Sequence, residues 1–349
     1  MPACPDSYAP SDPLNSSQGA SLVVDPIQTA ADVLAEAADV TLLAHVQPDA
    51  DSLGSALALG IALRRRGASV RVAFATPEEM PDTLAPFDVL GLVVPASAVP
   101  ATPDVLVVCD AAEPARLGAL AGLLDTARVS IMIDHHVSNP GFGDIQVLDP
   151  AAEATVVLAH RVLTALGAPL DVDIARCLYA GLVTDTVGFR TAGESAHLLA
   201  AELVAAGVEP EPLLRPMLDT HPFTWFAALS RALAGCVLEP EAAGGLGLVH
   251  TVLPAFDVAS FRAAEIDSVV DTVRTAAEAE VALVLKQVGD RRWSASMRSK
   301  GAVDVSRVAA RLGGGGHRAA AGFTRDGTVG QVLSDVRSAL AVPARPLAS

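Results

Sequence analysis

The chain has 349 residues, of which 51% are hydrophobic, and its formal net charge is −16 at pH 7. Apolar stretches are interrupted after about 5 to 8 residues, far short of the roughly 18 that a membrane-spanning helix needs, so we expect no membrane partner. The acidic balance also excludes a protein that coats long DNA or RNA, because such binding depends on neutralising phosphate charges. A chain of this length has room for two domains with separate cores.

The N-terminal segment and the cysteines indicate where the chain works. Residues 1–25 are rich in Pro, Ser, Asp and Ala and lack the positive and apolar regions of a signal peptide, which predicts a disordered tail. The four cysteines lie far apart without a CxxC pair, which argues against a zinc knuckle and against a disulfide framework. We therefore expect a cytoplasmic protein.

Short β-branched runs alternate with helical patterns in the first two thirds of the chain. We predict strands at residues 40–46, 70–76, 105–111 and 129–136, and a fifth candidate strand at 181–190. The runs are apolar at every position, not at every second one, which predicts strands buried on both faces of a parallel sheet with crossover helices. The first domain, residues 26–207, is therefore expected to be α/β.

A cluster of prolines between residues 208 and 224 predicts an inter-domain linker. Beyond it, the pattern predicts a smaller α/β domain over residues 225–342. Its expected elements are a strand at 245–253, a helix at 263–276 and a hairpin over 281–299 that turns near Gly289 and Asp290.

Polar residues gather where the expected strands of the first domain end. They are His45, Asp49, Asp51, Asp110, Asp134, His135, His136 and Asp185. In an open α/β sheet the carboxyl ends of the strands border the ligand crevice, so we expect these side chains to converge. A single aspartate at such a place is usually a turn or cap residue, and Asp51 fits the cap of a helix that starts near Ser52.

The chemistry of this set favours a pair of metal ions. Mixed imidazole and carboxylate donors suit octahedral Mn²⁺ better than Zn²⁺, which prefers thiolates or a compact tetrahedral set. The number of donors exceeds what one ion requires. Two ions roughly 3.5 to 4 Å apart can activate water and stabilise the charge on a phosphoryl oxygen, so the set predicts phosphoester hydrolysis.

A second candidate site lies near the C-terminus, at the four glycines Gly313, Gly314, Gly315 and Gly316, which precede His317 and Arg318. The glycines fit either a helix C-cap with a flexible connector or a backbone cradle for an anion. Nine basic and two acidic residues between Lys286 and Arg325 give a local charge of +7, and strand alternation places Arg298 on a polar face. A small anionic ligand is therefore expected here.

Five motifs carry a family resemblance. The segments "HVQPDADS", "CDAA", "DHH" and "GLVTDT" resemble, in order, the four motifs of the DHH phosphoesterase superfamily, and "GGGGHRAAAG" resembles the DHHA1 substrate-binding domain. Together they span about Ile27 to Leu340. By length and layout the chain most resembles the NrnA-type subgroup, which are bifunctional oligoribonucleases (nanoRNases) and phosphatases of 3′-phosphoadenosine-5′-phosphate (pAp).

The resemblance implies a role for each residue of the set. One Mn²⁺ would be bound by His45, Asp49 and Asp110, and the other by Asp51, Asp110, His135 and Asp185, with Asp110 bridging and Mg²⁺ or Co²⁺ as substitutes. Asp134 would stand behind the ligands as a catalytic residue, and His136 would face the phosphate. Arg298, the glycine run, His317 and Arg318 would bind substrate.

The resemblance also implies the activity. The first expectation is a Mn²⁺-dependent phosphoesterase that releases nucleoside monophosphates from RNA of about two to five nucleotides and converts pAp to AMP. The alternatives are hydrolysis of cyclic di-AMP or of its linear product pApA, and a non-catalytic nucleotide-binding regulator on the same scaffold. A homodimer is implied as well. The sequence does not rank short RNA, pAp and adenine dinucleotides as substrates.

Overall fold

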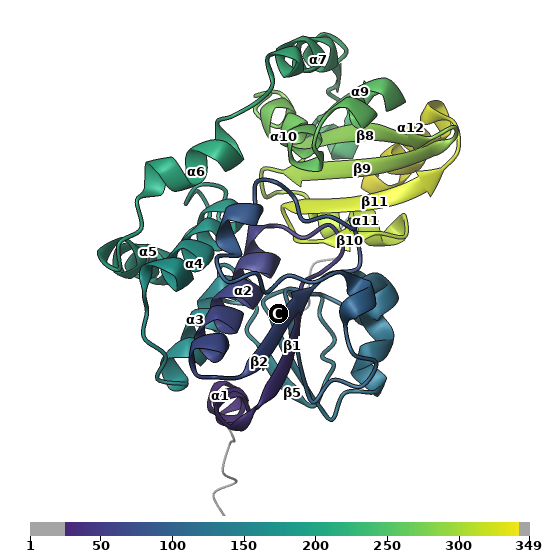
Figure 1. The fold of residues 1–349 in the computed structure, drawn as a ribbon. Helices are drawn as coiled ribbons and strands as arrows, with labels where there is room; N and C mark the ends of the chain where they lie inside the picture. The colour runs from purple at the N-terminus through teal and green to yellow at the C-terminus, as the bar shows by residue number, and fades with distance from the viewer. Residues whose placement is uncertain (1–24, 342–349) are drawn as a thin grey trace, which may run out of the picture.

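The computed structural model describes residues 25–341, which form two sheets with their helices (Figure 1). The predicted N-terminal tail lies, apart from Asp25, outside the described residues. In Figure 1 the sheet of the second domain stands above the first domain, and strands β10 and β11 are its nearest strands to the first domain.

The first sheet is parallel throughout, as predicted, with strand order β2-β1-β3-β4-β5. Its strands are β1 (Asp39–Leu43), β2 (Ser69–Ala73), β3 (Val105–Cys109), β4 (Val129–Asp134) and β5 (Ile145–Leu148). All five residues of β3 are buried, because helices cover both of its faces. The short strand β5, only partly buried, was not predicted.

Five α-helices and three 3₁₀ segments accompany this sheet. They are α1 (Pro26–Glu36), α2 (Ala50–Arg65), η1 (Ala85–Phe87), η2 (Ala96–Ala98), η3 (Pro114–Asp125), α3 (Thr155–Ala165), α4 (Val172–Asp185) and α5 (Glu194–Ala205). Helix α2 is buried from Ala50 to Leu63, since it packs against both the sheet and α4.

The predicted strand at 181–190 is wrong. Residues up to Asp185 belong to α4, and a turn follows. Leu178 to Val183 are buried on every side of this helix, so the segment is apolar at consecutive positions. A short run of that kind does not distinguish a buried strand from a buried helix.

The second sheet is mixed, with strand order β10-β11-β9-β8-β7-β6. Its strands are β6 (Val237–Glu239), β7 (Leu248–Leu253), β8 (Val281–Gly289), β9 (Arg292–Ser299), β10 (Gly315–Gly316) and β11 (Ala320–Asp326). The predicted hairpin is confirmed as the antiparallel pair β8 and β9. Strands β7 and β8 are parallel and are connected through α9 and α10.

Helices cover both faces of the second sheet. They are α7 (Phe223–Ala234), α8 (Ala242–Gly245), α9 (Ala255–Ser260), α10 (Ala263–Val273), α11 (Val305–Arg311) and α12 (Val329–Leu340). Alternation along β9 explains the two layers: Trp293, Ala295 and Met297 point to the core beside α11 and α12, and the polar residues between them point the other way. A separate core around Trp225 packs α7 and α10 against β7 and β8.

Helix α6 (Pro210–Leu218) occupies most of the predicted linker between the domains. The helix begins at Pro210 and contains Pro216 in its last turn. The domain boundaries proposed from the sequence remain predictions. Within residues 25–341, no helix is both long enough and apolar enough to cross a bilayer.

Close packing of α2 against α4 fixes the helix that starts in the candidate site. A Cβ on Gly54 would lie 2.6 Å from the carbonyl oxygen of Cys177, so the two backbones touch there. We expect Gly54→Ala to lower the free energy of unfolding by about 1 to 3 kcal/mol, through forced separation of the helices. Denaturant titration measures this.

The matched control is Gly330→Ala in α12, where an added Cβ meets no atom within 4 Å. That variant should be as stable as the wild type or slightly more so, because alanine favours helix over glycine by about 0.5 to 1 kcal/mol. Equal stability of the two variants would contradict the packing argument.

Candidate metal-binding active site

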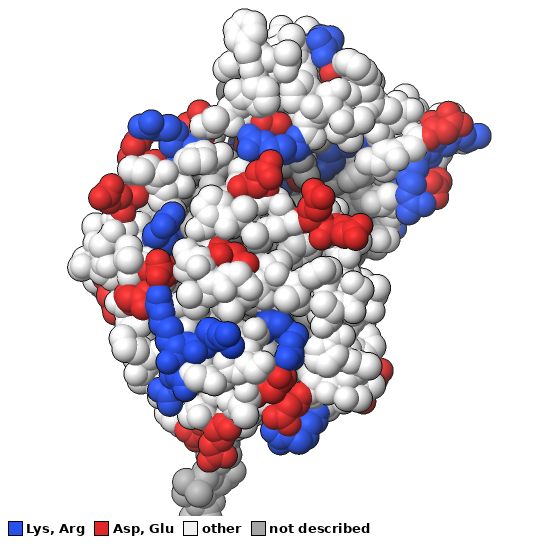
Figure 2. All heavy atoms as spheres, in the orientation of Figure 1, with Lys and Arg blue, Asp and Glu red and all other residues white. Residues whose placement is uncertain are grey.

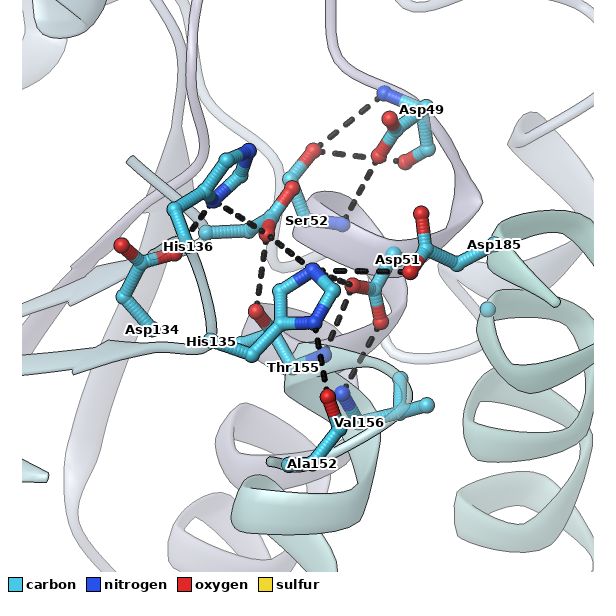
Figure 3. A network of polar contacts seen from close by, with 12 residues as sticks. Asp49, Asp51, Ser52, Asp134, His135, His136, Ala152, Thr155, Val156 and Asp185 are labelled. Carbon is cyan, nitrogen blue, oxygen red and sulfur yellow. Dashed lines mark hydrogen bonds and ion pairs between the residues drawn. The ribbon is translucent and has the colours of Figure 1, made fainter. Parts of the chain in front are cut away.

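The predicted convergence of polar residues at the strand ends is present in the structure (Figure 3). His45 follows β1, Asp110 follows β3 directly, and Asp134 is the last residue of β4. Asp110 has a positive φ of 59°, a backbone conformation that non-glycine residues seldom adopt. Its amide nevertheless donates to the Ile133 carbonyl at 2.9 Å, so the strained residue is held by its neighbour strand.

Two more carboxylates come from the first turn of α2. Asp49 is the N-cap, and its Oδ1 accepts a hydrogen bond of 2.9 Å from the Ser52 amide in a capping box. The alternative from the sequence, that Asp51 caps this helix, is therefore wrong. The cap uses one oxygen of Asp49 and leaves Oδ2 directed at His45, 3.5 Å from its Nε2.

Asp110 joins two groups of potential ligands. Its Oδ2 lies 3.4 Å from His45 Nε2, in the group that contains Asp49. Its Oδ1 lies 3.8 Å from His135 Nε2, in the group that contains Asp51. The two oxygens of one carboxylate thus face two neighbouring groups, which is the arrangement that a bridging ligand requires.

His135 lies close to the carboxylates of the second group. Its Nε2 lies 3.4 Å from Asp185 Oδ2 and 4.0 Å from Asp51 Oδ2. This nitrogen is buried and has no hydrogen-bond partner, whereas Nδ1 lies 3.1 Å from the Ala152 carbonyl. A carbonyl partner fixes the proton on Nδ1, so the unpartnered Nε2 presents a lone pair toward the carboxylates.

The same logic holds for the first group, because His45 Nδ1 lies 2.8 Å from the Val46 carbonyl and Nε2 faces the carboxylates. The residues present therefore fit divalent cations in both groups. The donors are imidazole nitrogens and carboxylate oxygens, without a thiolate, which suits Mn²⁺ or a similar ion.

The first turn of α3 holds two of these carboxylates. The amides of Thr155 and Val156 donate to the two oxygens of Asp51 at 2.8 and 2.9 Å (Figure 3). The Thr155 hydroxyl donates to Asp110 Oδ1 at 2.7 Å. These contacts were not predicted. Ala154 is a signal that sequence reasoning missed, because alanine is a poor residue for the N-cap of α3.

Asp134 and His136 form a pair beside the ligand groups. Asp134 is fully buried, and its Oδ1 lies 2.7 Å from His136 Nδ1. Asn139, another residue that the sequence did not reveal, donates to Asp134 Oδ2 at 2.5 Å. Asp134 is therefore fixed on both oxygens and orients the imidazole of His136.

The second domain contributes His317 to this site. The His317 ring stacks on His136 with a centroid distance of 4.3 Å and lies 5.1 Å from His135. The predicted substrate-binding segment is thus brought to the ligand groups of the first domain. Its assigned role in binding stays a prediction.

The glycine run has several structural reasons. Gly313 has a φ of 82° just beyond α11, as a C-cap glycine does. A Cβ on Gly314 would lie 2.1 Å from the Gly322 carbonyl oxygen, and one on Gly316 would lie 2.6 Å from that of Ala320, so the run packs tightly on β11. Gly315 has open space around it.

Two further predicted substrate contacts have partners within the protein. Arg298 Nε donates to Asp271 at 3.1 Å. Arg318 is two-thirds exposed, donates to the Gly301 carbonyl at 3.2 Å and lies 3.8 Å from Asp304. Substrate binding by these arginines also remains a prediction.

Burial and neighbouring charges shift the pKa values of the clustered residues. Burial and the charge of Asp110 raise the pKa of Asp51 and of Asp185 well above the usual aspartate range. Burial opposes protonation of His45, yet Asp49 and Asp110 raise its pKa to about 10. Protons thus compensate charges that cations would otherwise neutralise.

The pKa values of His136 and His317 shift in opposite directions. Burial lowers the pKa of His136, but the hydrogen bond to Asp134 and the charges of Asp110, Asp134 and Asp185 together raise it to about 9. Burial and the nearby His136 lower the pKa of His317 to about 4. A neutral His317 therefore stacks on a protonated His136 near neutral pH.

Comparison with known proteins shows which families and folds the chain matches. Residues 39–182 match the DHH family N-terminal domain, and residues 249–341 match the DHHA1 domain. An exopolyphosphatase-related protein from Bacteroides fragilis has the same fold, with a TM-score of 0.80 at 21% identity over 90% of this chain and 95% of that one. Fold and site together define a phosphoester hydrolase of the DHH class.

Two proteins of similar sequence show which members of the DHH class the chain resembles. The bifunctional oligoribonuclease and PAP phosphatase NrnA of Thermus thermophilus is 31% identical over 293 residues, which are 82% of this chain and 84% of that protein. The chain therefore belongs to the DHH–DHHA1 phosphoesterase family that includes this NrnA. The cyclic-di-AMP phosphodiesterase GdpP of Geobacillus thermodenitrificans is 26% identical over 88% of this chain and 48% of its own length.

Because Asp110 faces both ligand groups, its loss should weaken both. We expect Asp110→Asn to lower the affinity for Mn²⁺ by at least about 100-fold, more than the loss of an outer hydrogen bond costs, and to abolish turnover. Isothermal titration and metal analysis of the purified protein measure this.

The control for Asp110→Asn is Asp144→Asn, which removes a carboxylate that accepts from Ser130 away from the site. It should bind metal like the wild type. Wild-type affinity in Asp110→Asn would contradict the shared-ligand assignment.

Metal binding should release protons. With a pKa of about 10, His45 is protonated at pH 7 in the metal-free protein and must lose that proton to bind an ion. The affinity for Mn²⁺ should therefore fall as pH falls from 8 to 6, by up to about tenfold per pH unit for each proton released. Titration heats in buffers of different ionisation enthalpy count these protons, and heats independent of the buffer would contradict the expectation.

Proposed function

We propose that the chain is a Mn²⁺-dependent phosphoesterase that hydrolyses RNA of a few nucleotides to nucleoside monophosphates and removes the 3′-phosphate of pAp. The observation that supports this most is the meeting of two ligand groups at Asp110 beneath His317 of the second domain. Similarity to NrnA of Thermus thermophilus supports the choice of substrates.

The two groups of donors assign roles in this reaction. His45 and Asp49 would hold one ion, Asp51, His135 and Asp185 the other, and Asp110 would contact both. Divalent ions held there would supply Lewis acidity, which activates water and stabilises the charge on phosphoryl oxygens. Mg²⁺ or Co²⁺ would substitute for Mn²⁺.

The remaining residues act on the substrate. Asp134 holds Nδ1 of His136 and so directs the ring, whose other nitrogen would face a phosphate oxygen. Arg298, the glycine run, His317 and Arg318 would hold the far end of the substrate. Binding energy from that end positions the phosphate, so it should contribute to turnover as well as to affinity.

Surface charge supports a short substrate. On the face shown in Figure 2, acidic and basic residues are interspersed and no continuous basic band crosses the molecule. The local excess of positive charge between Lys286 and Arg325 is largely compensated by acidic partners, since Lys286 pairs with Asp267 and Arg325 with Asp335. Long RNA or DNA would gain little binding free energy from contact with such a surface.

Similarity to GdpP favours a second candidate, the hydrolysis of cyclic di-AMP or of pApA. The same site would accept either compound, since each presents a phosphodiester and an adenine base. A non-catalytic regulator is disfavoured because the chain retains all the predicted ligand residues and they lie close together around Asp110 and His135. The homodimer and the cytoplasmic location remain predictions from the sequence.

A substrate panel tests the proposal. Purified protein with Mn²⁺ is given pAp, cyclic di-AMP, pApA and RNA from 2 to about 24 nucleotides, and products are resolved by length. We expect the initial rate at fixed salt to fall with RNA length, because additional nucleotides add negative charge beside a protein of net charge −16. A rate that rises with length would reject the short-substrate proposal, and turnover of cyclic di-AMP alone would favour the second candidate.

Variants of the second domain distinguish binding of the far end of the substrate from hydrolysis at the metal site. His317→Ala and Arg318→Ala should reduce hydrolysis of dinucleotides and pAp about 10-fold or more. They should leave metal binding and hydrolysis of bis-p-nitrophenyl phosphate, which lacks a far end, nearly unchanged. An equal loss on both kinds of substrate would contradict a clamping role.

A further inference from the structure

Helix α3 begins beside the metal site, and its first turn is not capped by the side chain of its own N-cap residue. Its N-cap residue is Ala154, which makes no side-chain hydrogen bond. The amides of Thr155 and Val156 donate instead to the carboxylate of Asp51, on a different helix. One ligand residue therefore serves as the cap of α3 from outside.

Thr155 makes a second contact that capping does not explain. Its hydroxyl donates to Asp110 Oδ1 at 2.7 Å, the oxygen that faces the His135 group. Thr155 is fully buried, so water does not compete for this hydrogen bond. A hydroxyl donor occupies one lone pair of Oδ1 and fixes the rotation of the carboxylate, which determines where the other lone pairs point.

The segment that carries Thr155 is itself anchored on its far side. Glu153 accepts hydrogen bonds from the Ser195 hydroxyl at 2.6 Å and from the Gly193 amide at 3.2 Å, at the start of α5. The contact between α3 and the carboxylates is thus supported by a neighbouring helix and does not depend on a mobile loop.

We propose that Thr155 is a positioning residue of the metal site, whose hydroxyl and amide set the separation and orientation of Asp110 and Asp51. It rests on the proposed metal-dependent function, and it acts through the ligands, without contact to substrate. The consequence is that loss of the hydroxyl alone should weaken cation binding even though every ligand is retained.

The test compares Thr155→Val, which removes the hydroxyl at nearly constant volume, with Thr155→Ser, which keeps it. The readout is the affinity for Mn²⁺ by isothermal titration, without substrate. We expect Thr155→Val to lose about 10- to 100-fold in affinity, and Thr155→Ser to stay within about threefold of the wild type.

Thr251→Val is the matched control. Thr251 is also buried, and its hydroxyl donates at 2.6 Å to the Ala232 carbonyl in the second domain. This variant should lose thermal stability to a similar degree but bind Mn²⁺ like the wild type. If Thr155→Val does not fold, Thr155→Ala against Thr155→Ser makes the same comparison, since the two differ by the hydroxyl.

Two results would overturn the proposal: wild-type affinity for Mn²⁺ in Thr155→Val, or equal losses in Thr155→Val and Thr155→Ser. The titration also separates this inference from the proposed function. A wild-type protein that binds no divalent ion would refute both, whereas a wild-type protein that binds ions and hydrolyses none of the proposed substrates would leave the role of Thr155 intact.

Discussion

Repulsion between closely spaced carboxylates is the constraint to which the site and its surroundings respond. Asp49, Asp51, Asp110 and Asp185 meet at one edge of the first sheet, where Asp51 and Asp110 are buried and their negative charges are costly. Three of them are held by donors: Asp49 by a capping box, Asp51 by two amides and Asp110 by a hydroxyl. Asp185 sits at the negative end of α4 and lacks such support. The arrangement has a shortage of positive charge that divalent cations would correct.

The meeting of the two domains follows from the same edge. Parallel strands bring their carboxyl ends together, and the turn between β10 and β11 places His317 above them, stacked on His136. The proposed metal ligands and the proposed substrate contacts thus come from elements with separate hydrophobic cores. If substrate binds beside His317, as proposed, its affinity includes the free energy of displacing part of this imidazole stacking.

Much of this was predictable from the sequence, and the failures have physical causes. The parallel sheet was predicted because strands buried on both faces are apolar at every position, and the strand-end aspartates and histidines stand out after such runs. Asp185 was found in spite of a wrong element, since a helix end and a strand end both deliver a side chain to the crevice. Thr155 and Asn139 were missed because they act through hydrogen bonds to residues distant in sequence. For the same reason the sequence did not show that acidic residues of other segments pair with part of the local charge of +7.

The glycines of the run are present for different structural reasons. Gly314 and Gly316 are required by contact of their backbone with β11, so intolerance to substitution there would report packing and not ligand recognition. Gly315 lies between them with no neighbouring atom within 4 Å of an added Cβ. A side chain introduced at that position would extend from the second domain without disturbing β10, which makes residue 315 a natural attachment point for a spectroscopic label that reports when the two domains separate.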